Sequence, residues 1–125
     1  SEEELLFETK YGKLTGYEVF VKYCETRDWE LMDEVLHDDY MCVDELAVLN
    51  KEEMRQRSIE DKKRGFELVD GKEIFDSEDA LIFSHPMKGD WGAYTAGEKY
   101  DEIIHVCLKK DKKVWREMIK IKKAE

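Results

Sequence analysis

Long hydrophobic runs and closely spaced cysteines are both lacking in this sequence. No apolar run exceeds a handful of residues, whereas a transmembrane helix needs about 20 apolar residues and a signal peptide needs an apolar core. The three cysteines, Cys24, Cys42 and Cys107, have apolar neighbours and no C-x-x-C spacing. That pattern is typical of reduced, packed thiols rather than disulfides or zinc ligands. We therefore expect a cytoplasmic protein with no membrane partner.

Positive charge is also scarce. The 21 lysines and arginines face 31 aspartates and glutamates, which gives a net charge of −10. A nucleic-acid partner or an anionic membrane requires a basic surface, so neither is expected. The exception is Lys109–Lys123, which holds eight of the 21 basic residues. This run is either an anion-binding edge or a solvated edge strand. Lysines commonly protect such edge strands from aggregation.

The motifs of metal and phosphate sites are missing too. There is no closely spaced histidine or cysteine set, no glycine-rich phosphate loop and no G-x-S-x-G elbow. Each of these sites depends on ligands or backbone amides at a fixed spacing. The sequence therefore predicts no metal and no cofactor.

What the chain does have is enough apolar material for one core. Its 125 residues are 42% hydrophobic and 11% aromatic, which indicates a single domain over 1–125 with residues 1–14 as an N-terminal arm. The charged fraction of 42% is well above the usual ~25% and must lie mainly on the surface.

The stretch Thr15–Glu45 predicts a helix, a tight turn, a second helix and a strand. Thr15 and Glu18 form the pattern of a capping box at the start of the first helix. Asp28 is placed to cap the second helix, whose apolar stripe runs to Leu36. After the Asp38-Asp39 pair the residues alternate with the period of a strand.

The rest of the chain predicts a third helix followed by strands. Asn50 and Glu53 form a second capping box, and the helix should end at Gly65. Strands are expected over 66–75, 80–87, 94–108 and 114–122, with a loop at 88–93 and a hairpin turn at 109–113. Asp70-Gly71 would form a bulge or a tight turn within the first of these strands. Helices first and strands afterwards indicate an α+β fold.

One strand has apolar residues on both faces. Ile103–Leu108 is apolar at both parities apart from His105, whereas a strand with one solvated face would alternate. Since the helices cover only one face of the sheet, the other face should meet a second copy of the chain. We therefore predict a homodimer that forms through the sheet.

The order of helix, "DW", helix, "DD" and strand, with the ending VCLKKDKKVWREMIKIKK, resembles the nuclear-transport-factor-two-like superfamily. That group includes SnoaL-like polyketide cyclases, ketosteroid isomerase and scytalone dehydratase, and the resemblance covers about residues 15–123. It implies N-terminal helices packed on a strongly curved antiparallel or mixed sheet, which forms a cone with an internal cavity. Members of the group often form dimers through the sheet face.

The resemblance also implies a candidate base. Asp44 falls where ketosteroid isomerase carries its catalytic aspartate, and DDYMCVD is similar to that motif. Burial would raise the pKa of such a carboxyl and make it a usable general base. The alternative is a structural aspartate at the rim that caps backbone amides. Phe20 stands in the position of the isomerase tyrosine that donates to the oxyanion, so Tyr17 or Tyr40 would have to donate instead.

Two histidines and several aromatic residues complete the candidate site. His105 and His85 lie on predicted strands and would shuttle a proton to or from Asp44, although a lone histidine on an apolar strand is more often a core residue. The candidate ligand-binding residues are Tyr17, Phe20, Tyr40 and Trp115. They suit a small apolar or aromatic molecule.

Two kinds of function remain open on the sequence. The first is a cofactor-independent isomerase, cyclase or dehydratase in which Asp44 is the general base. The second is a non-catalytic homodimeric module that binds a ligand or another protein, because function depends on a site and not on a fold.

Overall fold

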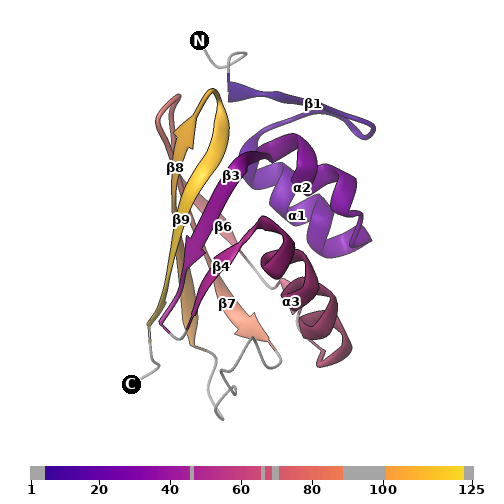
Figure 1. Cartoon of the computed structure of the whole chain (residues 1–125), viewed down its shortest axis with the longest axis vertical. Coiled ribbons are helices and arrows are strands. Elements are labelled where there is room, and N and C mark those ends of the chain that lie inside the picture. Colours follow the sequence, from indigo (N-terminus) through magenta and orange to yellow (C-terminus); the bar gives the residue numbers. More distant parts are fainter. Residues whose placement is uncertain (1–4, 46, 66, 69–70, 89–100, 123–125) are drawn as a thin grey trace.

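The computed structural model describes residues 5–45, 47–65, 67–68, 71–88 and 101–122 (Figure 1). The elements in these residues are β1 (Phe7–Thr9), β2 (Gly12–Leu14), α1 (Gly16–Thr26), α2 (Trp29–Val35), β3 (Leu36–Val43), β4 (Val48–Asn50), α3 (Lys51–Lys63), β5 (Glu67–Leu68), β6 (Lys72–Asp76), β7 (Ala80–Lys88), β8 (Glu102–Lys110) and β9 (Lys113–Lys122). No helix among the described residues is long and apolar enough to cross a membrane.

The predicted helix starts are confirmed. The Thr15 hydroxyl accepts from the amide of Glu18 at 3.1 Å, and the Glu18 carboxylate accepts from the amide of Thr15 at 2.9 Å. Asn50 and Glu53 make the same reciprocal pair at the start of α3. These side chains satisfy amide donors that have no partner inside the helix, which is why the helices begin at these residues.

The boundary between α2 and β3 differs from the prediction. α2 has only seven residues, and the chain becomes extended at Leu36, two residues before the Asp38-Asp39 pair. Leu36 is buried in the core and pairs with Val114 of β9, so tertiary packing rather than the helical stripe decides its conformation.

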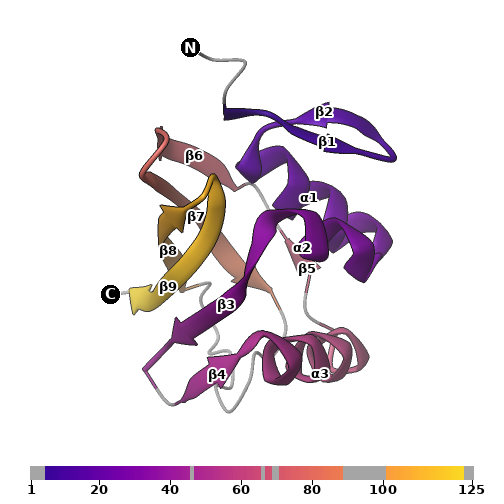
Figure 2. The same ribbon diagram turned by 45° about the horizontal axis from the view of Figure 1, so that its top comes forward.

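Apart from the separate hairpin β1–β2, the described strands form one mixed sheet in the order β4-β3-β9-β8-β7-β5, and β6 also pairs with β7. β3 and β9 are parallel, whereas the other neighbours are antiparallel. Register shifts interrupt three of these pairings, β3 with β9, β6 with β7 and β8 with β9. Such irregularities bend strands and increase their twist, and the sheet is visibly curved (Figures 1 and 2).

All three helices of the described chain lie on the concave side of this sheet (Figure 1). The predicted α+β fold class is therefore confirmed. The buried core lies between helices and sheet, with Val19 and Leu31 from α1 and α2 and Ile103, Cys107 and Ile119 from β8 and β9. Residues 103, 105 and 107 of β8 are buried on the inner side, whereas Leu108 on the outer side is 49% exposed.

Three other predictions have mixed outcomes. The N-terminal arm forms the hairpin β1–β2, and its Phe7 and Leu14 pack against the core. The strand predicted at 66–75, with a bulge or tight turn at Asp70-Gly71, is divided near that position into β5 and β6, which both pair with β7. Most of the predicted loop at 88–93 and the start of the strand at 94–108 lie outside the described residues.

Candidate functional site

A pocket of about 100 Å³ lies between the helices and the sheet. Its walls are mostly aromatic and aliphatic, with a small number of polar groups. The described residues that line it are Phe20, Tyr23, Cys24, Arg27, Trp29, Met32, Leu36, Tyr40, Met54, Ser58, Asp61, His105, Glu117 and Ile119. A mostly apolar pocket with a few placed polar groups is typical of small-molecule sites.

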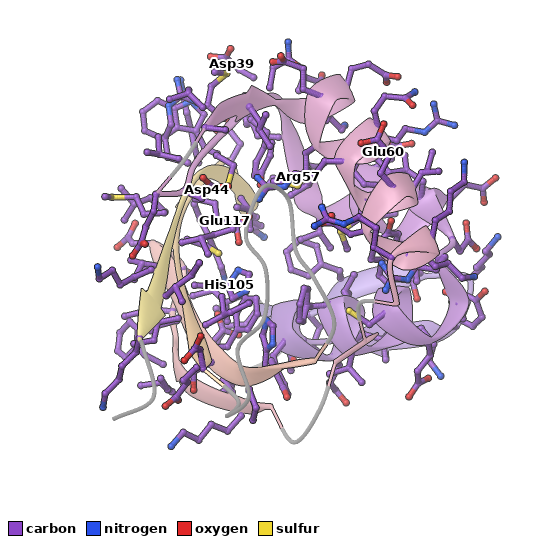
Figure 3. All side chains as sticks on the ribbon, turned by 90° about the horizontal axis from the view of Figure 1, so that it is seen from below. Asp39, Asp44, Arg57, Glu60, His105 and Glu117 are labelled. Carbon is purple, nitrogen blue, oxygen red and sulfur yellow. The ribbon has the colours of Figure 1, made fainter. Side chains whose placement is uncertain are left out.

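The polar end of the pocket is built by neighbouring strands of the sheet. Glu117 lies on β9 directly opposite Cys107 of β8 and Cys42 of β3, so it faces the same side as these buried residues. Its Oε2 is 2.6 Å from Nδ1 of His105, and its Oε1 accepts a hydrogen bond of 2.5 Å from the Tyr40 hydroxyl. Figure 3 shows Glu117 and His105 close together on the inner side of the sheet.

These contacts shift the pKa values of Glu117 and Tyr40. Burial raises the pKa of this carboxyl, but hydrogen bonds from His105 and Tyr40 and the charge of His105 outweigh burial, and the pKa falls below its usual range. Burial and the nearby Glu117 raise the pKa of Tyr40 well above 10. The phenol is therefore protonated at neutral pH, so Tyr40 is a permanent donor at this site.

His85 extends the polar end by one strand. Its Nε2 is 3.0 Å from Nε2 of His105, and its Nδ1 is 3.0 Å from the carbonyl oxygen of Pro86. Burial and the neighbouring His105 lower the pKa of His85 from 6.5 to about 4. The ring of Phe83 stacks on the imidazole of His105 with 4.3 Å between ring centroids, so the imidazole has a fixed orientation. His85, His105, Glu117 and Tyr40 thus form one continuous chain of contacts across β7, β8, β9 and β3.

Asp44 lies elsewhere. It follows the last residue of β3, its side chain is 2% exposed, and it forms an ion pair with Arg57 of α3. Its other oxygen accepts a hydrogen bond of 2.8 Å from the amide of Ala47. Figure 3 shows Asp44 beside Arg57. Asp44 is not among the described residues that line the pocket, so its role as a base stays a prediction that this geometry does not favour.

The other predicted site residues divide into two groups. Phe20, Tyr40 and His105 line the pocket. His85 contacts His105 but does not belong to the described lining. Tyr17 packs on Phe83 with 5.6 Å between ring centroids, and Trp115 has the guanidinium of Arg116 3.9 Å from its ring. Neither Tyr17 nor Trp115 belongs to the described lining of the pocket.

Glu117 is a candidate functional residue that was not predicted from the sequence, because it lies within the basic run Lys109–Lys123. The available signal was its parity, because Glu117, Ile119 and Ile121 alternate on one face of β9 and the two isoleucines are buried. An acid that shares a face with buried isoleucines needs a partner, and that partner is His105.

No group of three or more His, Cys, Asp or Glu side chains among the described residues is arranged to hold a metal ion. The described lining of the pocket offers acids and bases of its own. A carboxylate, an imidazole and a phenol in contact are able to accept, hold and donate a proton.

Comparison with known proteins identifies the fold. No protein-family model matches the sequence, and no curated protein matches it. A candidate polyketide cyclase from Sinorhizobium meliloti has 14% identity and a TM-score of 0.62, with 82% of this chain and 91% of that chain covered. A candidate isomerase of the SnoaL-like family from Agrobacterium tumefaciens has 11% identity and a TM-score of 0.62, with 86% and 94% covered.

An NTF-2-like protein of unknown function from Burkholderia xenovorans has 8% identity and a TM-score of 0.62, with 87% of this chain and 81% of that chain covered. Identities this low establish the shared architecture and leave the chemistry of each site open. The chain has the fold of the nuclear-transport-factor-two-like, SnoaL-like superfamily.

Proposed function

We propose that this protein binds a small cyclic carbonyl compound and catalyses a cofactor-independent proton transfer on it, with Glu117 and His105 as the acid–base pair. The observation that carries the proposal is the Glu117–His105 contact of 2.6 Å at the polar end of an otherwise apolar pocket. Isomerisation, cyclisation and dehydration all belong to this class, because each begins with the removal of a proton beside a carbonyl group.

The pocket limits the size and shape of the ligand. A dry protein cavity of about 150 Å³ accommodates benzene, so a pocket of about 100 Å³ limits the ligand to no more than one small ring. Phe20, Trp29 and Met32 supply flat and adaptable apolar walls. The ligand would place its ring against these walls and its polar group at Glu117.

The mechanism uses contacts that already exist in the protein. Glu117 takes a proton from a carbon next to the carbonyl group, and the substrate becomes an enolate. His105, bonded to the other carboxylate oxygen, keeps a positive charge close to the new anion. The Tyr40 hydroxyl, which donates to Glu117 in the free protein, turns to the enolate oxygen. Glu117 then returns the proton to a different carbon, as in an isomerisation.

The names of the structural relatives agree with this reaction class. One is described as a candidate polyketide cyclase and another as a candidate isomerase. The proposal gives Asp44 a structural role instead, as the anchor that holds α3 to the end of β3 through Arg57.

The proposed chemistry is testable without the natural substrate. In D₂O, a general base exchanges the acidic hydrogens of cyclohexenone for deuterium, and NMR measures the rate. We expect the protein to accelerate this exchange and Glu117→Gln to reduce the acceleration on the order of a hundredfold or more, as for the loss of a general base. The control is Glu25→Gln, an exposed residue of α1 paired only loosely with Lys22 at 3.4 Å. Equal rates for the two variants would contradict the proposal.

We also propose that two copies associate through the outer face of the sheet. An apolar row crosses that face, and each member is the register partner of the next: Val48, Val43, Met118, Val106, Ile82 and Phe75. Val48 is 60%, Met118 62% and Phe75 50% exposed. A continuous exposed apolar patch of this kind marks an interface, and a second copy offers the same apolar row without any other protein.

Light scattering at micromolar concentration tests this association. The expected mass is twice 14.9 kDa, and Met118→Arg should return the chain to a monomer because it buries an unpaired charge at the interface. Ile59→Arg is the matched control, since Ile59 is also an exposed apolar residue, at 42%, but lies on α3. A wild-type monomer, or dissociation by both variants, would remove the proposal.

A further inference from the structure

The positions of the hydrogens in the chain His85–His105–Glu117 follow from its contacts. Nδ1 of His85 lies 3.0 Å from the carbonyl oxygen of Pro86. A carbonyl oxygen only accepts, so Nδ1 must carry the hydrogen. A neutral imidazole has one N–H, and therefore Nε2 of His85 is an acceptor.

This assignment fixes the next residue. Nε2 of His85 and Nε2 of His105 are 3.0 Å apart and both are buried, so one of them donates to the other. Since Nε2 of His85 accepts, Nε2 of His105 donates. His105 thus keeps a hydrogen on Nε2 whatever happens at its other nitrogen.

The remaining contact then holds one proton. Nδ1 of His105 and Oε2 of Glu117 are 2.6 Å apart, and a hydrogen must lie between them. If it belongs to His105, the pair is an imidazolium and a carboxylate. If it belongs to Glu117, both groups are neutral. In either case the pair has no net charge.

We propose that His85 is a positioning residue that fixes the tautomer of His105, so that His105 and Glu117 share a single proton at the wall of the pocket. The neutrality of His85 supports this, because burial and His105 keep its pKa near 4. The other titratable groups that face the pair are Tyr40 and Cys42 of β3 and Cys107 of β8. Burial raises the pKa of all three, so they stay protonated at neutral pH.

The shared proton defines the class of substrate. This step rests on the proposed function. A pair without net charge becomes positive when it accepts a proton, and it then stabilises one negative charge beside it. That suits a neutral ketone that becomes an enolate, and it does not suit a ligand that is already an anion.

Nitrogen NMR of histidine-labelled protein without ligand tests the tautomers, because it distinguishes protonated from unprotonated ring nitrogens. At pH 7 we expect His85 to be protonated at Nδ1 alone and His105 to be protonated at Nε2. His37 is an internal reference of the opposite kind, because its Nδ1 accepts from the amide of Asp39 at 3.0 Å and must be unprotonated. A wild-type His85 with an unprotonated Nδ1 would overturn the proposal, without any variant.

Two substitutions separate positioning from simple packing. His85→Leu removes the acceptor, so His105 should lose the hydrogen on Nε2 at pH 7 and become a neutral imidazole that donates from Nδ1 to Glu117. His85→Gln supplies an amide oxygen as acceptor and should restore the wild-type pattern. An unchanged His105 in His85→Leu would overturn the proposal. Failure of the cyclohexenone exchange with correct tautomers would instead overturn only the proposed function.

Discussion

Two carboxylates with little exposure, Asp44 after the end of β3 and Glu117 on β9, differ in their partners. Asp44 is paired with the guanidinium of Arg57, whereas Glu117 is paired with the imidazole of His105. A guanidinium stays charged at any pH at which the protein is folded, but an imidazole gains and loses a proton near neutrality. The first pair is therefore suited to hold an element in place, and the second is suited to exchange a proton.

The positions of the two pairs agree with this difference. Asp44 joins the end of β3 to α3, where Arg57 also lies 3.9 Å from Asp61. α3 is mostly polar, with Asp61 as its only fully buried residue in the described chain, so apolar packing alone does not hold it. Glu117 instead lies within the sheet and lines the pocket, with a side chain that is 12% exposed. The different tasks that we propose for these two acids therefore depend on the bases beside them.

The largest expected effect comes from breaking the first pair. Asp44→Asn leaves Arg57 buried with one partner fewer, and loss of one member of a buried ion pair costs about 3–5 kcal/mol in the free energy of unfolding. Urea denaturation measures this. The cyclohexenone exchange per folded molecule should stay unchanged.

The control for Asp44→Asn is Asp39→Asn. The Asp39 carboxylate is 3.9 Å from the guanidinium of Arg116 and 74% exposed, so its loss should change stability by less than about 0.5 kcal/mol. A stable Asp44→Asn variant that has lost its exchange activity would reverse the comparison and assign the base to Asp44.

The comparison also explains which features the sequence could predict. The capping boxes at Thr15 and Asn50, the helical hairpin and the strand periodicity depend on residues a few positions apart, and all of these are present in the structure. The end of α2 was predicted too late, because the burial of Leu36 against β9 decides it.

The candidate site depends on long-range register and was therefore only partly predictable. Glu117 meets His105 across 12 residues and Tyr40 across 77 residues of the chain. The Tyr40 contact requires the parallel pairing of β3 with β9, which no local pattern specifies. The His105 contact lies across the antiparallel pair of β8 and β9 and depends on the register of that hairpin. Likewise, the partner of Asp44 comes from a helix whose surface looks uniformly polar in the sequence.

The second prediction concerns how the free energy of unfolding depends on pH through His85, which contacts the His105–Glu117 pair. The pKa of His85 is about 4 in the folded protein and 6.5 when unfolded, so between these values only the unfolded chain binds a proton there. Stability is therefore complete above pH 6.5 and falls as the pH drops to 4, by about 3 kcal/mol from this residue. The low pKa of Glu117 adds a loss of the same sign below its usual range near 4.5.

Urea unfolding at intervals from pH 7 to pH 4 measures this loss. His85→Gln has no titrating ring at this position, so its free energy of unfolding should fall less steeply over the same interval. Parallel curves for the wild type and the variant would show that His85 titrates normally. The Asp44–Arg57 pair should not distinguish the two proteins, because it is present in both.

The smallest expected effect comes from the Tyr40 hydroxyl, which donates to Glu117 of the second pair. Tyr40→Phe removes the hydroxyl that donates to Glu117 at 2.5 Å while the ring keeps its packing, and a hydrogen bond to a charged group contributes about 1.5–3 kcal/mol. The pKa of Glu117 should rise toward its usual range, because one of the contacts that lower it is gone. Carbon NMR of the Glu117 carboxyl measures that change directly.

The exposed counterpart is Tyr11→Phe, which loses a hydroxyl 3.3 Å from Asp28 and should leave both stability and Glu117 unchanged. If Glu117 is the base, Tyr40→Phe should also slow the cyclohexenone exchange, since the enolate loses its donor. The effect should be smaller than that of Glu117→Gln, because His105 still stabilises the anion. A faster exchange in Tyr40→Phe would mean that Tyr40 only restrains Glu117, and the donor to the enolate would then have to be His105.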